Sequence, residues 1–254
     1  MNEFLLQNYL IITHSVEVIA ALTGVFLLRN YRNGTTKYFI FFLVYLTICE
    51  FIAGYTRYVY PGKFLDILIG TIFQKNHWWA TLFWKIGAIM FFSFYYRKIL
   101  ETKFFKDVIK YCSFIFLIIS VSCIILNFEE FFYRFFPVIS ILGAVIVFLC
   151  TIFYFVETLQ SDKILTFYKS INFYISAAIF IWWLIITPIT FYDVYFVYEI
   201  GNPNRDWNFM FLRWQIYLFA NVSMYLTFTF ALIFCKPEAE IKIIPSDRIF
   251  SQKF

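Results

Sequence analysis

The sequence predicts an all-α, polytopic membrane protein with seven transmembrane helices. Three observations support this prediction: 62% of the 254 residues are hydrophobic, only 15% are charged, and the mean hydropathy is +0.73. Soluble domains carry about 25% charged residues. A membrane-spanning helix needs about 20 apolar residues, so the length accommodates roughly seven crossings. We expect one transmembrane domain over residues 1–235 and a short cytoplasmic tail over 236–254.

Apolar runs between charged or turn-forming breaks place the crossings. The expected spans are Tyr9–Leu28, Tyr38–Tyr58, Trp78–Tyr96, Tyr111–Leu126, Pro137–Val156, Phe173–Phe191 and Phe211–Cys235. The fourth is short, and we expect it to extend into the flanking Phe-rich segment. Backbone amides in lipid must find partners within their own segment, and the period-two alternation of a barrel is missing. The spans are therefore predicted to be helices.

The distribution of Lys and Arg predicts the orientation. One side of the membrane carries fourteen: Arg29, Arg32, Lys37, Arg97, Lys98, Lys103, Lys106, Lys110, Lys163, Lys169, Lys236, Lys242, Arg248 and Lys253. The other carries six: Arg57, Lys63, Lys75, Arg134, Arg205 and Arg213. Basic residues are retained in the cytoplasm. We expect an inner (plasma) membrane protein with its amino terminus outside and its carboxyl terminus in the cytoplasm.

Two outer connections are long enough to form a lid. Residues 61–77 have helix-like apolar spacing, which predicts a helix lying along the membrane surface. Residues 192–210 contain the turn cluster Gly201, Asn202, Pro203 and Asn204. The inner connections are short, so we expect an inward signal to be read by a protein partner.

Three ionisable residues lie near the middle of their expected spans: Glu17, Glu50 and Lys85. A charge at the centre of a spanning helix costs about 2.5 to 3.5 kcal/mol, so we expect the three to face one another. Two interpretations stay open. Lys85 can neutralise one carboxylate while the cluster only fixes packing, or the cluster can bind a proton, an ion or a small polar ligand.

Three further residues complete the candidate ligand- or proton-binding set. His14 lies one turn from Glu17, and we expect a hydrogen bond between them. Arg213 and Asn221 belong to a polar stripe on the last span that also includes Tyr217 and Tyr225. We expect Arg213 to extend to the outer water and Asn221 to join helices.

Enzyme chemistry finds little support in the sequence. There are two His, no CxxC pair among five Cys, and no GxSxG, HExxH or phosphate-binding Gly loop. A bis-His haem would need His14 and His77 at one depth, but we expect His77 at the membrane edge and His14 a turn or more inside. A retinal would need a Lys within the last span, and none occurs there before Lys236. We expect a non-enzymatic protein without metal or cofactor. Its expected partners are membrane lipid and a protein, with no nucleic acid.

The order of the spans leaves a second function open. Spans one to three and five to seven have the same orientation and the same order of short inner and long outer connections. Parallel repeats of this 3+1+3 kind occur in small transporters. The two triplets share no residue pattern, so a sensor or membrane subunit is the first prediction and a small-solute or ion transporter the alternative.

Three stretches carry a family resemblance. They are His14–Ala21, the pair Glu50 and Gly54, and the last-span residues Ala220, Asn221, Met224 and Tyr225. In these places the chain resembles small seven-helix inner-membrane proteins of Bacteroidetes-type bacteria. The resemblance extends to the overall layout and implies no known activity.

Overall fold

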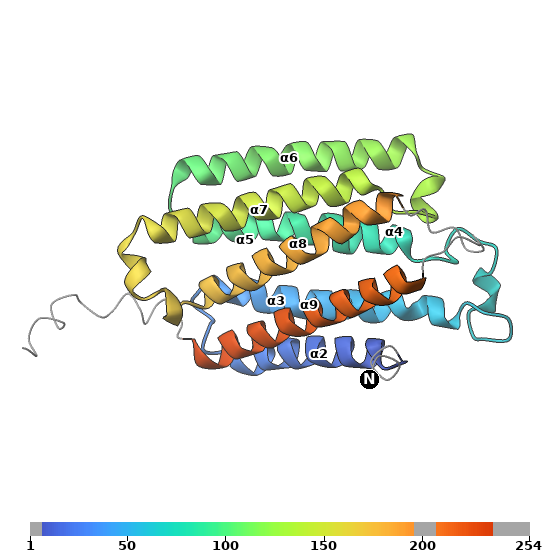
Figure 1. Cartoon of the computed structure of the whole chain (residues 1–254), viewed down its shortest axis with the longest axis horizontal. Coiled ribbons are helices and arrows are strands. Elements are labelled where there is room, and N and C mark those ends of the chain that lie inside the picture. The colour runs from blue at the N-terminus through green and yellow to red at the C-terminus, as the bar shows by residue number, and fades with distance from the viewer. Residues whose placement is uncertain (1–6, 196–206, 236–254) are drawn as a thin grey trace, which may run out of the picture.

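The computed structural model describes residues 7–195 and 207–235, which form an elongated bundle of helices (Figure 1). The long helices are α2 (Tyr9–Leu27), α3 (Thr36–Ala53), α6 (Lys103–Leu126), α7 (Pro137–Leu159), α8 (Ile171–Tyr195) and α9 (Trp207–Phe234). A further continuous stretch contains α4 (His77–Trp79), the π-helical segment η3 (Ala80–Ile86) and α5 (Gly87–Ile99). The described ranges contain no strand, which confirms the all-α class.

Six helices of the described chain are long and apolar enough to cross a membrane. They are the six long helices, with α3 prolonged to Tyr58 by the 3₁₀ turn η1 (Gly54–Tyr58). These helices make the chain a multi-pass membrane protein. The stretch His77–Ile99 is not among the six, so a seventh crossing stays a prediction.

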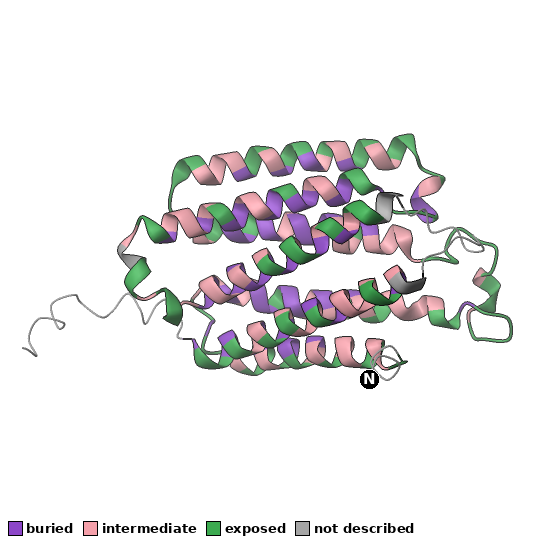
Figure 2. Ribbon diagram, in the orientation of Figure 1, coloured by how far each residue is buried: buried purple, intermediate pink, exposed green. Residues whose placement is uncertain are grey.

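Six helical stretches form a ring, and α6 lies outside it. Helix α2 packs against α3 and α9, α9 packs against α8, and α8 packs against α7. The stretch η3–α5 closes the ring between α3 and α7, while α6 packs on the outside of α5 and α7 (Figure 1). Buried residues face the interior of the bundle and exposed ones its periphery, as expected for helices surrounded by lipid (Figure 2).

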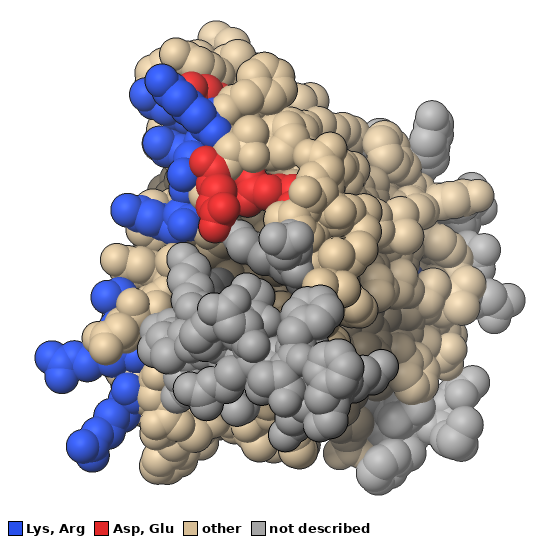
Figure 3. Space-filling model, turned by 90° about the vertical axis from the view of Figure 1, so that its left-hand side faces the viewer, with Lys and Arg blue, Asp and Glu red and all other residues tan. Residues whose placement is uncertain are grey.

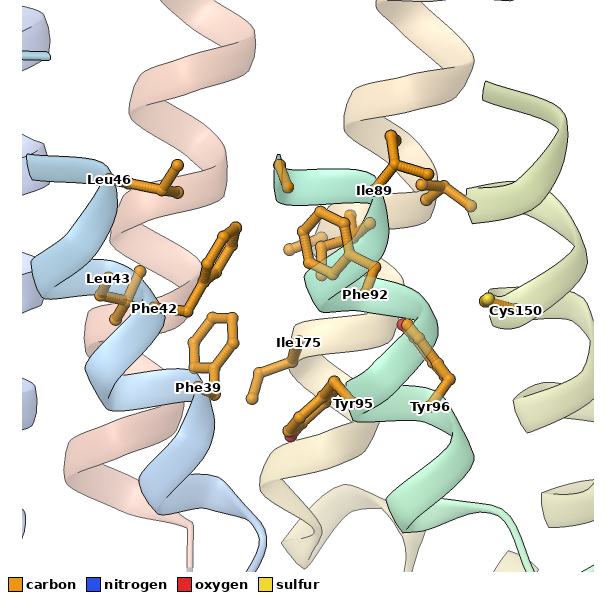
Figure 4. Close-up of a cluster of buried hydrophobic side chains, with 14 of the residues drawn as sticks. Phe39, Phe42, Leu43, Leu46, Ile89, Phe92, Tyr95, Tyr96, Cys150 and Ile175 are labelled. Atoms are coloured by element: carbon orange, nitrogen blue, oxygen red, sulfur yellow. The ribbon is translucent and has the colours of Figure 1, made fainter. Parts of the chain in front are cut away.

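Aromatic side chains fill the ring. Phe39 and Phe42 on α3 lie opposite Tyr95 and Tyr96 on α5, with Ile175 of α8 between them (Figure 4). Each tyrosine hydroxyl finds a polar partner on α8: Tyr95 is 2.6 Å from the side-chain oxygen of Asn172, and Tyr96 is 2.9 Å from the hydroxyl of Ser176. Buried hydroxyls with partners fix how α5 faces α8.

One end of the bundle carries the α2–α3, α5–α6 and α7–α8 connections. Lys and Arg gather along one edge of this end, beside an acidic patch (Figure 3). Glu157 of α7 accepts backbone N–H bonds from Glu101 and Thr102, both at 2.8 Å, and so fixes the α5–α6 connection. The hydroxyl of Tyr31, in the α2–α3 connection, lies 2.9 Å from the carbonyl oxygens of Leu232 and Cys235. It ties the first connection to the end of α9.

Two segments differ from the expectation. Helix α6 begins at Lys103 instead of Tyr111, because Ile109 is fully buried while Lys103 and Lys110 are exposed, so the basic segment continues as an amphipathic helix. The predicted surface helix in residues 61–77 is wrong. Gly62 and Gly70 adopt φ of 76° and 78°, which end any helix there, and only the 3₁₀ turn η2 (Asp66–Leu68) forms between them.

Candidate functional site

Two carboxyl groups, one on α2 and one on α3, interact electrostatically. Glu17 on α2 is only 2% exposed, and Glu50 on α3 acts on it electrostatically. We call Glu17 and Glu50 the acidic pair. Tyr225 of α9 is 4% exposed and interacts electrostatically with both carboxyl groups. The acidic pair therefore lies where α2 meets both α3 and α9.

Small side chains bring these helices close enough to bury a carboxyl group. Ala20, Ala21 and Gly24 are buried on α2, within two turns of Glu17. A Cβ atom at Gly24 would lie 3.0 Å from the Cγ2 of Ile40 on α3, so the glycine permits the close approach. The sequence of α2 thus combines a charge with the tight packing that removes it from lipid.

An arginine and a histidine lie beside the acidic pair. Arg57, in η1, places a guanidinium nitrogen 3.2 Å from the Nε2 of His14, and it also acts electrostatically on Glu50. Because guanidinium only donates, Nε2 must accept, and His14 is then a neutral imidazole protonated on Nδ1. That Nδ1 lies 3.7 Å from the Oε2 of Glu17. The distance is too long for the hydrogen bond predicted between these residues, although the two groups do face each other.

Oε1 of Glu17 is buried and has no hydrogen-bond partner in the described structure. Thr13, one turn away on α2, interacts through its side chain with Tyr9. Threonine hydroxyls elsewhere in the helices vary: those of Thr47 and Thr151 donate to the carbonyl oxygens of Leu43 and Val147, four residues earlier, at 3.0 Å, whereas the buried Oγ1 of Thr81 has no partner among the described residues. Buried polar atoms are rarely left without partners, so each such atom requires an explanation.

Lys85 lies elsewhere, and the prediction that it joins the two carboxylates is wrong. Its ammonium donates to the hydroxyl of Ser140 on α7 at 2.6 Å and lies 4.2 Å from the ring centre of Phe135. Within the described ranges, no ion pair joins Lys85 to either member of the acidic pair. The cation that acts on Glu50 is Arg57.

The π-helical turn explains where Lys85 points. A π-helix widens the turn, so residues after its start no longer follow the α-helical face. The hydroxyl of Tyr45 on α3 donates to the carbonyl oxygen of Phe83 at 2.7 Å, within this turn. Gly87 leaves room for that hydroxyl, because a Cβ atom there would lie 2.8 Å from the Tyr45 oxygen. Tyr45, Phe83 and Gly87 together hold the turn that directs Lys85 toward α7.

The two candidates on α9 have separate surroundings. Asn221 accepts a hydrogen bond of 2.7 Å from the indole of Trp182 on α8, so it joins two helices. The guanidinium of Arg213 lies 4.9 Å from the ring centre of Tyr217 and acts electrostatically on Tyr9 of α2. Arg213 therefore acts on α2, the helix that carries Glu17, whereas Asn221 contacts α8.

Arg57 belongs to this site although the candidate set omitted it. Arg57 follows Glu50 by seven residues, which is two helical turns, so the sequence places both on one face of the helix. This spacing was the signal for including Arg57 with Glu50.

Comparisons with protein-family models, with curated proteins and with solved structures found no match to this chain. Among the residues that the structure describes, no group of three or more His, Cys, Asp or Glu side chains is arranged to hold a metal ion. The geometry of the acidic pair is therefore the basis of the functional proposal.

Proposed function

We propose that this chain is a non-enzymatic, seven-helix protein of the inner membrane that senses a proton or a small ligand at the acidic pair and acts through a protein partner. One observation carries the proposal. Glu17 is almost completely buried, interacts electrostatically with a second carboxyl group, and leaves one oxygen without a hydrogen-bond partner among the described residues. Two carboxylates in a low-dielectric site cannot both stay ionised without a neutralising group.

The proposed orientation has the amino terminus outside and the tail in the cytoplasm. It is supported by the basic residues gathered at the end of the bundle that carries the α2–α3, α5–α6 and α7–α8 connections (Figure 3). In this orientation Arg57 and His14 lie on the outer side of the acidic pair, because α2 runs inward and α3 outward. A proton or ligand would reach the pair from outside, past these two residues.

Cys49 offers a direct test, because it precedes Glu50, is 5% exposed and interacts electrostatically with both carboxyl groups. In a protein that retains Cys49 as its single cysteine, we expect the pH profile of labelling by a membrane-permeable maleimide to contain a second titration in addition to the ionisation of the thiol itself. Glu17→Gln should remove this second titration and leave the profile of the thiol alone, since the glutamine does not titrate. Glu129→Gln, an exposed site in the α6–α7 connection, is the matched control.

Two results would count against the sensor. A labelling profile that follows the ionisation of the thiol alone would contradict it, and so would a second titration that persists in Glu17→Gln. In either case neutralising the pair has no conformational effect.

The alternative is a small-solute or ion transporter with a 3+1+3 layout. It is supported by the ring, in which the first three helical stretches meet the last three at the α2–α9 and α5–α7 contacts while α6 lies outside. The acidic pair occurs in the first three alone, which favours the sensor. Purified protein in liposomes decides between them: sustained dissipation of an imposed proton or sodium gradient would favour the transporter.

A further inference from the structure

A groove of about 340 Å³ lies between the first half of α3 and the helix α5. Its walls consist of aromatic side chains at helical spacing and one glycine: Tyr38, Phe41, Phe42 and Tyr45 on α3, with Gly87, Phe91 and Phe94 on α5. Phe41 is 56% exposed and Phe94 is 40% exposed. The groove therefore opens to the periphery of the bundle, where lipid surrounds the helices.

The inside of the groove is apolar. Phe42, which is only 4% exposed, stacks on Phe91 with 3.9 Å between the ring centres and closes the groove toward the interior of the bundle. The hydroxyl of Tyr45 already donates to the carbonyl oxygen of Phe83 at 2.7 Å. Gly87 contributes no side chain and so leaves space at the deep end. Such a surface suits a hydrocarbon chain and offers little to a polar ligand.

The dimensions of the groove also favour a hydrocarbon chain. Tyr38 and Tyr45 are seven residues apart on α3, which corresponds to a length of about 10 Å. One turn of a helix with its side chains, about 10 Å across and 5.4 Å long, fills roughly 420 Å³. This is more than the whole groove, so a partner helix could only lie across it. A length of 10 Å fits within one leaflet, because the hydrocarbon core of a bilayer is about 30 Å thick.

Two lysines lie at the end of the groove nearest the α2–α3 and α5–α6 connections. The ammonium of Lys37 is 5.3 Å from the ring centre of Tyr38, and the ammonium of Lys98 is 5.7 Å from the ring centre of Phe94. These two rings line the groove and meet edge to face, with 5.4 Å between their centres. Both ammonium groups therefore lie beside one aromatic pair at the mouth of the groove.

The charge of these lysines is available to a ligand. No ion pair joins Lys37 or Lys98 to a carboxylate in the part of the chain that the structure describes. Three acids near this end, Glu101, Asp107 and Glu157, lie in the α5–α6 connection, on α6 and on α7, and the last already accepts two backbone N–H bonds. Lys and Arg gather along one edge of this end (Figure 3). The mouth of the groove thus presents positive charge at the level of lipid headgroups.

We propose that an anionic phospholipid binds in this groove, with an acyl chain among the aromatic side chains and its phosphate between Lys37 and Lys98. The apolar walls hold the chain, and the two lysines prefer an anionic headgroup over a zwitterionic one. In the proposed orientation the lipid belongs to the cytoplasmic leaflet, whose anionic lipids attract basic residues near the surface. The site is separate from the acidic pair and does not depend on the proposed sensor.

Thermal unfolding of the purified full chain in a neutral detergent tests the proposal. The melting temperature is measured against increasing fractions of dioleoyl phosphatidylglycerol or dioleoyl phosphatidylcholine in the micelles. We expect phosphatidylglycerol to raise the melting temperature by several degrees more, since a ligand that binds the folded state stabilises it. Inorganic phosphate, and a phosphatidylglycerol with six-carbon chains, should each have little effect, because neither fills the groove.

Variants of the lysines assign the effect to the mouth of the groove. Lys37→Gln with Lys98→Gln should raise the half-saturating fraction of phosphatidylglycerol about thirtyfold, which corresponds to about 2 kcal/mol, or about 1 kcal/mol for each lysine. Lys103→Gln with Lys110→Gln removes the same charge from exposed sites on α6, at the same end of the bundle. This matched variant should change the half-saturating fraction much less.

A second pair of variants tests the apolar wall. Phe41→Ala removes the most exposed aromatic side chain of the groove and should weaken the response to phosphatidylglycerol. Phe114→Ala, at a 62% exposed site on α6, is the matched control and should keep the response. Both variants retain every charge, so this comparison decides even where the double lysine variant fails to fold.

Each outcome decides the proposal. Equal shifts with phosphatidylglycerol and phosphatidylcholine overturn the site. Equal losses in the two double lysine variants also overturn it, because they would mean a general attraction to this end of the bundle. A shift that inorganic phosphate or the six-carbon lipid reproduces would mean that the lysines bind a free anion without a chain. A response that Phe41→Ala leaves at the wild-type level overturns the place of the acyl chain.

Discussion

A methyl group at position 87 is the sharpest perturbation of the π-helical turn. The Cβ atom of Gly87→Ala would lie 2.8 Å from the Tyr45 hydroxyl oxygen and 3.3 Å from the Leu82 carbonyl oxygen. The hydroxyl cannot move away freely, because it donates a 2.7 Å hydrogen bond to Phe83. The variant must therefore strain the contact between α3 and η3 and also disrupt this hydrogen bond.

The expected cost follows from these two effects. Overpacking costs about 1 to 3 kcal/mol, and a lost hydrogen bond about 1 kcal/mol. The better helix propensity of alanine returns about 0.5 to 1 kcal/mol. We expect a net destabilisation of about 2 kcal/mol, which lowers the melting temperature of a chain of this size by about 4 to 8 °C. Differential scanning fluorimetry of the protein in detergent measures this change.

A double variant isolates the cause. Tyr45→Phe removes the hydroxyl that the new methyl group meets, and the nearest remaining ring atom, Cζ, is 3.8 Å away. Adding Gly87→Ala to Tyr45→Phe should therefore cost much less than Gly87→Ala costs in wild type, with the 3.3 Å contact to the Leu82 carbonyl oxygen remaining. Gly54→Ala, where the nearest atom is the Cζ of Arg57 at 3.8 Å, is the control and should cost little. Additive effects at positions 45 and 87, or a Gly87→Ala protein as stable as wild type, would refute the reasoning.

Three further predictions concern topology and buried polar groups. A cysteine introduced at Asn33 should resist an impermeant thiol reagent in intact cells while one at Asn204 reacts; labelling at Asn33 would reverse the orientation. Lys85→Met should lower the melting temperature, and Glu50→Gln should not rescue it, because the lysine bonds to α7; recovery in the double variant would reinstate a lysine–carboxylate pair. Asn221→Leu should cost about 1 to 3 kcal/mol in thermal stability by leaving the Trp182 indole without an acceptor, and no loss would mean that water replaces it.

Hydropathy alone predicts the helices well, because the length of an apolar run is a local property. The run Pro137–Val156 lies within α7, and both begin at Pro137. The same argument explains why α6 was placed too late, since its first two turns carry lysines that lower the hydropathy while the helix continues. The connection after α3 was mispredicted because apolar spacing does not register the backbone φ of Gly62 and Gly70.

The site was predictable only in part. Burial of Glu17 and its approach to Glu50 follow from the cost of charges in lipid and from the small residues on α2. The position of Lys85 does not follow from the sequence. The direction of its side chain was predicted with an α-helical period, and the π-helical segment η3 interrupts that period. The position of Tyr225 beside both carboxyl groups depends on the packing of helices whose residues are 208 positions apart in the chain, and this is not a property of any sequence window.

The contact between α2 and α9 has a consequence for how the protein is made. Glu17 and Tyr225, which interact in the finished bundle, are 208 residues apart. At a synthesis rate of about 5 to 20 residues per second, roughly 10 to 40 s separate the insertion of these two residues. Until α9 arrives, the nascent chain holds a glutamate on a surface that nothing yet covers. The Tyr31 contact with Leu232 and Cys235 then forms once α9 has been made and closes the bundle. Biogenesis of this chain therefore requires that the glutamate be kept neutral, or sheltered by the insertion machinery, for as long as translation takes to reach the last helix.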